Sequence, residues 1–190
     1  VGGSKYSWRV AHFQVDVHIR ISGNAIYPYY QDGAVCFLRL APTDEKIREN
    51  IEGELSFIRY LRENGYPAAE PIASRSGEYL LTMKTEWGEY FATAFRGVGG
   101  IRIDRTDYSD EIMHSFGKSL GRLHALSSRY SPDKGKWSWE DALQWTEQVL
   151  VEYRAPEAAR RDLDSLREAL SALPKSYTTY GLVHYDFEPD

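Results

Sequence analysis

The first third of the chain has the apolar and polar alternation of β-strands. Apolar residues over 15–21 alternate with polar ones, which is the period of a strand with one buried face. A similar run covers residues 25–30, and the Asp32-Gly33 pair is a hairpin signal before an apolar run over residues 34–40. These runs predict a three-stranded antiparallel meander. Pro28 predicts that the middle strand is an edge strand or is bulged near that point.

A helical period replaces this alternation at Asp44. From there to Leu61 apolar residues recur at steps of three and four, until the Asn-Gly-Tyr-Pro sequence of residues 64–67 gives a stop signal, so one amphipathic helix is predicted. Runs around Ile72, over 78–83 and over 90–95 are separated by Gly-containing turns and predict two more short strands. The sheet then has about five strands.

Glycines at 97, 99 and 100 mark the predicted boundary between two parts of the chain. The helical period then predicts helices from about Ser109 to Leu126, from a capping sequence at 138–141, and over 157–173. A sheet with one helix, a glycine break and then helices indicates an α+β protein of two unequal lobes, residues 1–96 and 97–190.

Composition narrows the classes of protein that remain. The 190 residues carry 28 acidic and 23 basic side chains, a net charge of -5, without a basic stripe, which argues against nucleic acid as a partner. Apolar stretches are far shorter than the roughly 20 residues of a membrane span, so no membrane association is expected. Cys36, the single cysteine, excludes an internal disulfide and favours a reducing compartment, from which we expect a cytoplasmic location. Nothing in the composition indicates an oligomeric state.

Three short motifs occur in an informative order. Residues 37–40 read Phe-Leu-Arg-Leu, residues 120–126 read Leu-Gly-Arg-Leu-His-Ala-Leu, and residues 182–190 read Leu-Val-His-Tyr-Asp-Phe-Glu-Pro-Asp. They resemble the third strand, a helix and the catalytic loop of the aminoglycoside phosphotransferase and choline kinase group, which is related to the protein kinases. The resemblance spans roughly residues 15–190. In that group an Asn would come directly after Asp190, so we expect the chain to end inside its catalytic loop.

The resemblance implies a fold and an activity. The fold would be protein-kinase-like, with a five-stranded antiparallel sheet and one helix in a nucleotide-binding lobe that ends at a hinge, and with a partial helical second lobe. The activity would be transfer of the γ-phosphate of ATP to a hydroxyl of a small molecule, such as an aminoglycoside, a choline-like amine or another metabolite. Mg²⁺ would be held by the loop Asn and a later Asp. Because neither is in this chain, no metal ligand is assigned and the chain as given is expected to be inactive.

The catalytic residues implied by the resemblance are Asp186 and His184. Phosphoryl transfer depends mainly on positioning and charge neutralisation, and Asp186 would orient the acceptor hydroxyl and take its proton. His184 would have a structural role in the same loop. The alternative for these two residues is a polar turn that follows a buried strand.

Arg39 and Glu54 are the candidates for the phosphate-binding pair. In the kinase pattern a strand Lys meets the α- and β-phosphates and a helix Glu holds it. Arg39 stands in place of that Lys, and its guanidinium would grip phosphate as a fork where an ammonium acts as a point charge. The alternatives are a surface charge at a strand edge for Arg39 and a solvated helix face for Glu54.

Two further nucleotide contacts follow from position in the resemblance. Ser22, Gly23 and Asn24 would form the phosphate loop, where a tight turn exposes backbone N–H groups. An ordinary hairpin turn is the alternative. The hinge would lie near Ala94 and Arg96 and would offer backbone groups to adenine.

A second hypothesis is a non-catalytic protein. Arg39 replaces the usual Lys, and Tyr185 stands where the group usually has Gly. Both departures favour a pseudokinase-like nucleotide-binding module or an inactive fragment. Transfer of phosphate by a longer chain would exclude this hypothesis. For the kinase hypothesis, the acidic balance of the chain suggests cationic acceptors such as amines.

Overall fold

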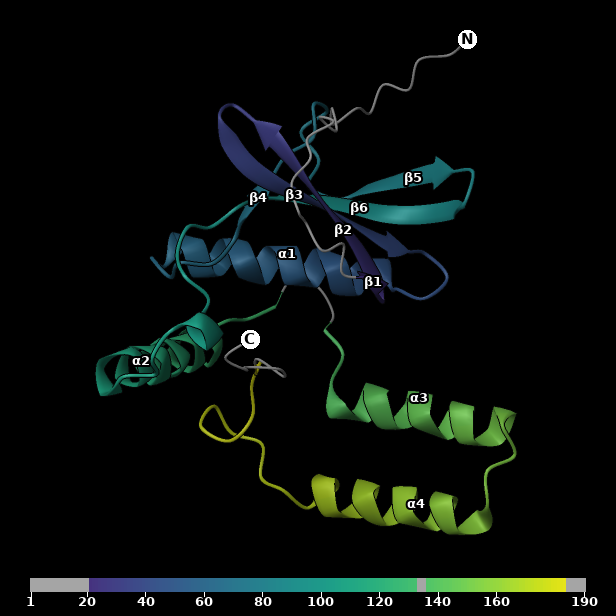
Figure 1. Ribbon diagram of the computed structural model, residues 1–190. Helices are drawn as coiled ribbons and strands as arrows, with labels where there is room; N and C mark the ends of the chain where they lie inside the picture. The colour runs from purple at the N-terminus through teal and green to yellow at the C-terminus, as the bar shows by residue number, and fades with distance from the viewer. Residues whose placement is uncertain (1–20, 133–135, 184–190) are drawn as a thin grey trace.

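The computed structural model describes residues 21–132 and 136–183, and these form a sheet with one helix followed by three further helices (Figure 1). The strands are β1 (Ile21–Ser22), β2 (Asn24–Gln31), β3 (Ala34–Pro42), β4 (Glu70–Ile72), β5 (Leu81–Thr85) and β6 (Gly88–Arg96). The helices are α1 (Arg48–Glu63), α2 (Asp110–Ser127), α3 (Trp139–Glu152) and α4 (Glu157–Ser171), with a 3-10 turn at Ile103–Arg105. The predicted α+β class is confirmed.

The sheet is antiparallel, and its strands run in the order β1-β2-β3-β6-β4, with β5 paired to another part of β6. Asp32 (φ 50°) and Gly33 (φ 76°) both adopt the left-handed conformation, as a tight β2–β3 hairpin requires. Pro28 pairs with Phe37 of β3, and on its other side the described part of β1 pairs only as far as Ala25, so the predicted edge or bulge at Pro28 stays a prediction. The three-residue β4 adds a strand to the expected five. Residues 15–20 of the predicted first strand lie outside the described residues.

Helix α1 begins later than its apolar period indicated. It starts at Arg48, not at Asp44, and the backbone N–H of Lys46 donates to the Pro42 carbonyl at 3.0 Å in a turn that leads out of β3. Ile47 has extended backbone angles and no side chain caps the helix. The apolar period continues through this turn although the backbone is not helical. As a result Lys46 lies in a loop at the edge of the sheet.

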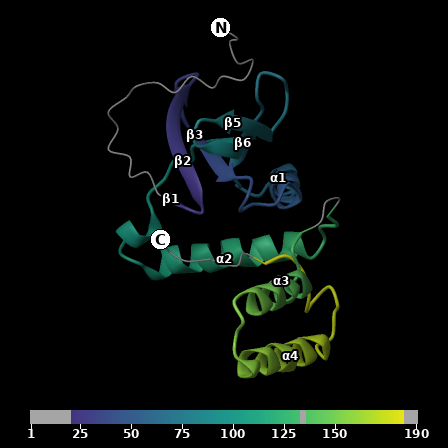
Figure 2. The ribbon, with the colours of Figure 1, turned by 90° about the vertical axis from the view of Figure 1, so that its right-hand side faces the viewer.

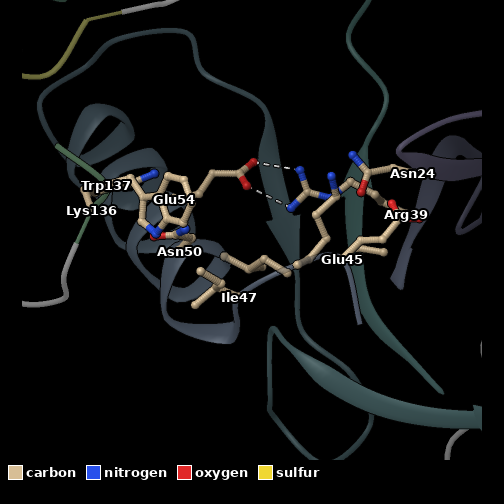
Figure 3. Close-up of a pocket in the computed structure, with 11 residues that line it drawn as sticks. Asn24, Arg39, Glu45, Ile47, Asn50, Glu54, Lys136 and Trp137 are labelled. Carbon is tan, nitrogen blue, oxygen red and sulfur yellow. Dashed lines mark hydrogen bonds and ion pairs between the residues drawn. The ribbon is translucent and has the colours of Figure 1, made fainter. Parts of the chain in front are cut away.

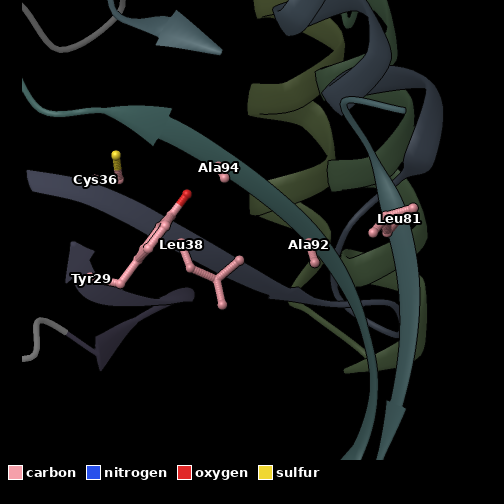
Figure 4. Close-up of a cluster of buried hydrophobic side chains, with 6 residues drawn as sticks. All are labelled: Tyr29, Cys36, Leu38, Leu81, Ala92 and Ala94. Atoms are coloured by element: carbon pink, nitrogen blue, oxygen red, sulfur yellow. The ribbon is translucent and has the colours of Figure 1, made fainter. Parts of the chain in front are cut away.

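Two apolar clusters lie on opposite faces of the sheet, because successive strand residues alternate between the faces. The cluster under α1 contains Ala41, Ile51, Leu55, Leu80 and Phe91. It fixes α1 against β3 and β6. The other cluster contains Tyr29, Cys36, Leu38, Leu81, Ala92 and Ala94 (Figure 4).

Tyr29 brings a hydroxyl into the second cluster. Its side chain is buried, and the hydroxyl makes no hydrogen bond with any residue that the structure describes. Burial, with a smaller contribution from the neighbouring Cys36 thiol, raises the pKa of Tyr29 from 10.0 to about 12. The folded protein therefore holds this proton more tightly than the unfolded chain does.

Replacing Tyr29 by Phe is expected to leave the free energy of unfolding unchanged or to raise it by about 1 kcal/mol at pH 8, because a buried hydroxyl without a partner is removed. From pH 10 to 12 the natural protein should lose stability, since deprotonation of Tyr29 is easier in the unfolded chain. The Tyr29→Phe protein should not show the part of this decrease in stability that comes from deprotonation of Tyr29. Urea unfolding at pH 8 and pH 11 measures it, with the exposed Tyr153→Phe as control. An equal alkaline loss in Tyr29→Phe and in the natural protein would contradict the prediction.

The C-terminal part of α1 is joined to α2 and to the segment that follows it. The Tyr60 hydroxyl donates to the Leu126 carbonyl at 3.1 Å, and the Tyr130 hydroxyl donates to Ser56 Oγ at 3.0 Å. The rings of Tyr60 and Tyr130 lie 4.9 Å apart between centroids. Arg122 of α2 adds a hydrogen bond of 2.8 Å to the Gly65 carbonyl. These contacts hold α2 against the end of α1, while the division of the chain after residue 96 stays a prediction.

Helices α3 and α4 lie side by side, and α3 is the nearer of the two to the sheet (Figures 1 and 2). The predicted cap of α3 is confirmed: Ser138 Oγ accepts from the Asp141 N–H, and the Asp141 carboxylate accepts from the Ser138 N–H at 2.7 Å. Among the helices that the structure describes, none combines the length and the apolar character needed to cross a bilayer.

Candidate functional site

Arg39 lies on the inner strand β3, opposite Ile26 of β2 and Thr93 of β6. Its guanidinium forms a two-pronged ion pair with Glu54 of α1, with Nη1 donating to Oε1 at 2.8 Å and Nη2 donating to Oε2 at 3.0 Å (Figure 3). The Arg39 side chain is 19% exposed and the Glu54 side chain 35%. The structure therefore brings together the strand cation and the helix acid that the resemblance paired.

Two neighbours on β6 complete the setting of Arg39. Its Nε donates to Thr93 Oγ1 at 3.1 Å, and its guanidinium carbon lies 5.3 Å from the centre of the Phe95 ring. Thr93 is 1% exposed, so the hydroxyl that receives Nε is itself fixed within the sheet. Three nitrogens of one guanidinium are thus engaged, which holds the group in one orientation.

A pocket of about 400 Å³ lies beside the ion pair. In addition to Arg39 and Glu54 its wall includes residues from β2, from the loop before α1, from α1 and from the segment before α3, namely Asn24, Lys46, Asn50, Lys136 and Trp137. Figure 3 shows Lys136 and Trp137 on one side of Glu54 and Arg39 on the other. Residues far apart in the sequence thus surround one carboxylate.

Lys136 is a partly buried cation in the pocket lining. Burial lowers the pKa of its ammonium below the ordinary value, Glu54 opposes this shift by attraction, and Arg39 adds to it by repulsion. Within the described residues Lys136 has no carboxylate within ion-pair distance. An anion in the pocket would supply the charge that this ammonium lacks.

The predicted phosphate loop is a tight connection between β1 and β2, with Ser22 opposite Asn24. Asn24 lines the pocket. Gly23 lies against a lysine: a methyl group placed on its Cα would come within 2.8 Å of Lys46 Nζ. The connection is an ordinary hairpin in form, and it faces the same pocket as Arg39. Its binding to phosphate stays a prediction.

Ala94 and Arg96 are placed away from this pocket. The Ala94 side chain is buried in the cluster with Cys36 and Leu38 on the other face of the sheet. Arg96 forms an ion pair with Glu70 at 3.2 Å. Both residues lie where β6 has β3 on one side and β4 on the other. Their proposed contact with adenine stays a prediction.

His184 and Asp186 lie outside the described residues. The structure describes the chain that leads to them: residues 177–183 run past the C-terminal part of α2 and line a hollow with His124 and Ser127. The second motif and the start of the third are therefore neighbours in space, while the roles of His184 and Asp186 stay predictions. The described residues hold no group of three or more His, Cys, Asp or Glu arranged to bind a metal ion.

The chain matches a family model described as the phosphotransferase enzyme family over residues 26–190. This chain belongs to that family. The resemblance seen in the three sequence motifs is thereby confirmed.

Relatives of this phosphotransferase family extend the comparison. Amicoumacin kinase of Bacillus subtilis (strain 168) is 25% identical over 170 residues, which are 86% of this chain and 49% of that protein. Among solved structures, the amicoumacin kinase hAmiN in complex with AMP-PNP, Ca²⁺ and Ami has a TM-score of 0.71 at 24% identity, covering 93% of this chain and 55% of that one. A microcompartment-associated aminopropanol kinase has a TM-score of 0.62 at 22% identity, covering 96% of this chain and 57% of that one. These likenesses confirm the protein-kinase-like fold, and the chain spans about half the length of these relatives.

Several residues at the Arg39–Glu54 pocket were not predicted from the sequence. Thr93 could have been identified from the pairing of β3 with β6, because the residue opposite Arg39 lies on the same face of the sheet. Lys46 was assigned to a helix that in fact begins after it. Lys136 and Trp137 come from the connection between α2 and α3, and no spacing in the sequence indicates that this connection reaches Glu54.

Proposed function

We propose that the protein containing this chain is an ATP-dependent small-molecule kinase that transfers the γ-phosphate to a hydroxyl group. The observation that supports it is the Arg39–Glu54 pair between strand and helix, at a pocket reached by the Gly23 turn. Membership of the phosphotransferase enzyme family supports the reaction type, and the hAmiN complex with AMP-PNP and Ca²⁺ supports use of a nucleotide with a divalent cation. We propose Mg²⁺ as that cation.

The residues around the pocket suit a polyphosphate. Arg39 is held by Glu54 and Thr93, so it needs no reorganisation to face a negative charge, and a preorganised charge is the kind that stabilises transferring phosphoryl groups. Lys136 provides an ammonium without a carboxylate partner among the described residues. When bound, ATP supplies the phosphoryl group and Mg²⁺ neutralises part of its charge. Asp186 would orient the acceptor hydroxyl and accept its proton.

The acceptor that we propose is a hydroxyl-bearing amine. One structural relative is named an aminopropanol kinase. Aminopropanol carries both an amine and a hydroxyl group. The net charge of -5 is compatible with attraction of a cationic acceptor. We further propose that the protein acts in the cytoplasm, which is supported by its single, buried cysteine.

The alternative function is nucleotide binding without catalysis. Arg39 replaces the Lys that the resemblance leads one to expect, and Glu54 and Thr93 engage all three nitrogens of its guanidinium. An arginine engaged in this way favours a structural pair and hence a pseudokinase-like module or an inactive fragment. The two functions differ in whether phosphate leaves ATP for an acceptor.

The test is a matched pair of acceptors. The intact natural protein is incubated with Mg·ATP and either 1-amino-2-propanol or propylamine, which lacks the hydroxyl, and a panel of larger amino alcohols follows. We expect ADP and a phosphorylated product, identified by mass, only with hydroxyl-bearing amines. ATP binding without transfer to any acceptor would favour the non-catalytic alternative. Failure to bind ATP would contradict both functions.

A further inference from the structure

The charges around the pocket are not balanced by the Arg39–Glu54 pair. These two side chains neutralise each other through two hydrogen bonds of 2.8 and 3.0 Å. Among the lining residues that the structure describes, the remaining cations are Lys46 and Lys136, and the remaining acid is the exposed Glu45. The local balance is therefore positive in a chain whose net charge is -5. A positive pocket on an acidic protein is the kind of site that attracts an anionic ligand.

Lys136 approaches from the helical half of the chain. It precedes Ser138, the cap of α3, so the start of that helix fixes the backbone close to it. Its ammonium is partly buried beside Glu54, whose two carboxylate oxygens are already engaged by Arg39. A partly buried cation that shares the acid beside it with an arginine is costly unless a second negative group is present. The pocket is where such a group would bind.

Lys46 comes from another segment of the pocket lining. It lies in the loop between β3 and α1, and its ammonium is placed against Gly23, where the absence of a side chain leaves room for it. Within the described residues it forms no ion pair. Lys46 therefore brings a positive charge to the turn that was predicted as the phosphate loop, although that turn contains a single glycine.

We propose that Lys46 and Lys136 are phosphate-binding residues that together hold the polyphosphate of the nucleotide in the Arg39–Glu54 pocket. This inference rests on the proposed kinase function and assigns the phosphate contacts within it. Arg39 is fixed by Glu54 and Thr93, while the two lysines contribute flexible point charges from two separate segments of the chain. One charge comes from the loop between β3 and α1 and one from the segment before α3, so a bound polyphosphate would link the two halves of the chain.

The experiment measures nucleotide affinity by calorimetry on the intact natural protein. Lys136→Gln and Lys46→Gln are each expected to weaken ATP binding roughly tenfold, as loss of a charged hydrogen bond does, and to change AMP binding less than about twofold. Lys118→Gln, an exposed lysine on α2, is the matched control and should bind ATP like the natural protein. Lys136→Arg, which keeps the charge, should recover part of the affinity.

The outcomes separate the two proposals. If the natural protein does not bind ATP, the kinase function fails and this inference fails with it. If the natural protein binds ATP and both glutamine variants bind ATP with the same affinity as it does, only this inference is overturned. The inference is also overturned if the variants lose affinity for ATP and for AMP by the same factor. If a variant folds poorly, chemical acetylation of lysines in the natural protein is measured with and without ATP instead. ATP should slow the acetylation of Lys46 and Lys136 and leave the acetylation of Lys118 unchanged. Unprotected labelling of both lysines would overturn the inference.

Discussion

Asp186→Asn is expected to lower kcat for phosphoryl transfer about 10³-fold while the Kd for ATP changes little. A carboxylate can orient the acceptor hydroxyl and take its proton, and a positioned general base of this kind contributes about 10²- to 10⁴-fold. An amide of the same size keeps the shape and loses the basic oxygen. Because Arg39 and the two lysines meet the phosphates in our proposal, the nucleotide should still bind.

The control for this substitution is Asp162→Asn, an exposed carboxylate on α4. It makes the same chemical change far from the phosphate pocket and should leave kcat unaltered. Steady-state assays with a hydroxyl-bearing amine and calorimetry with ATP give the two readouts. A kcat for Asp186→Asn equal to that of the control would show that residues 182–190 are an ordinary turn after a strand.

Glu54→Gln is expected to lower kcat/KM about 10²-fold, the cost of misplacing a catalytic contact by about 1 Å. Glu54 fixes both terminal nitrogens of Arg39, and a neutral amide can accept only one of these hydrogen bonds with its oxygen. The guanidinium would then move toward the phosphates or toward solvent. Because the pair is partly exposed, the free energy of unfolding should fall by only about 1 kcal/mol.

Two substitutions show whether this loss comes from the pair itself. Glu49→Gln changes an exposed acid in the first turn of the same helix and should leave kcat/KM unchanged. Arg39→Lys should keep kcat/KM within about tenfold of the natural value, since an ammonium still carries the charge to the pocket. A Glu54→Gln protein with full activity would contradict a catalytic role for the pair and would leave Arg39 as a structural residue.

The strands were largely predictable because their alternation and turn chemistry are local. The Asp32-Gly33 hairpin follows from the residue types that tolerate positive φ. The start of α1 was predicted wrongly at Asp44. Apolar spacing can report which face will be buried, but in the turn out of β3 the chain keeps that spacing without helical hydrogen bonds.

The site was predictable only where its residues sit on regular elements within a known motif order. Arg39 and Glu54 come from an inner strand and the next helix, so their meeting follows from the fold. Lys136 reaches Glu54 from a connection after α2, and such a contact depends on how the helical part packs. No periodicity within the sequence carries that information.

Helix α1 is attached both to the sheet and to α2. Glu54 meets the sheet through Arg39, while Tyr60, less than two helical turns away, meets α2 through the Leu126 carbonyl. Because both contacts are made by one rigid helix, a movement at one contact is transmitted to the other. A shift of α2 that displaces Tyr60 would rotate α1 and move the Glu54 carboxylate relative to the Arg39 guanidinium. A molecule that binds between α1 and α2, far from the phosphates, would thus change the affinity for the nucleotide.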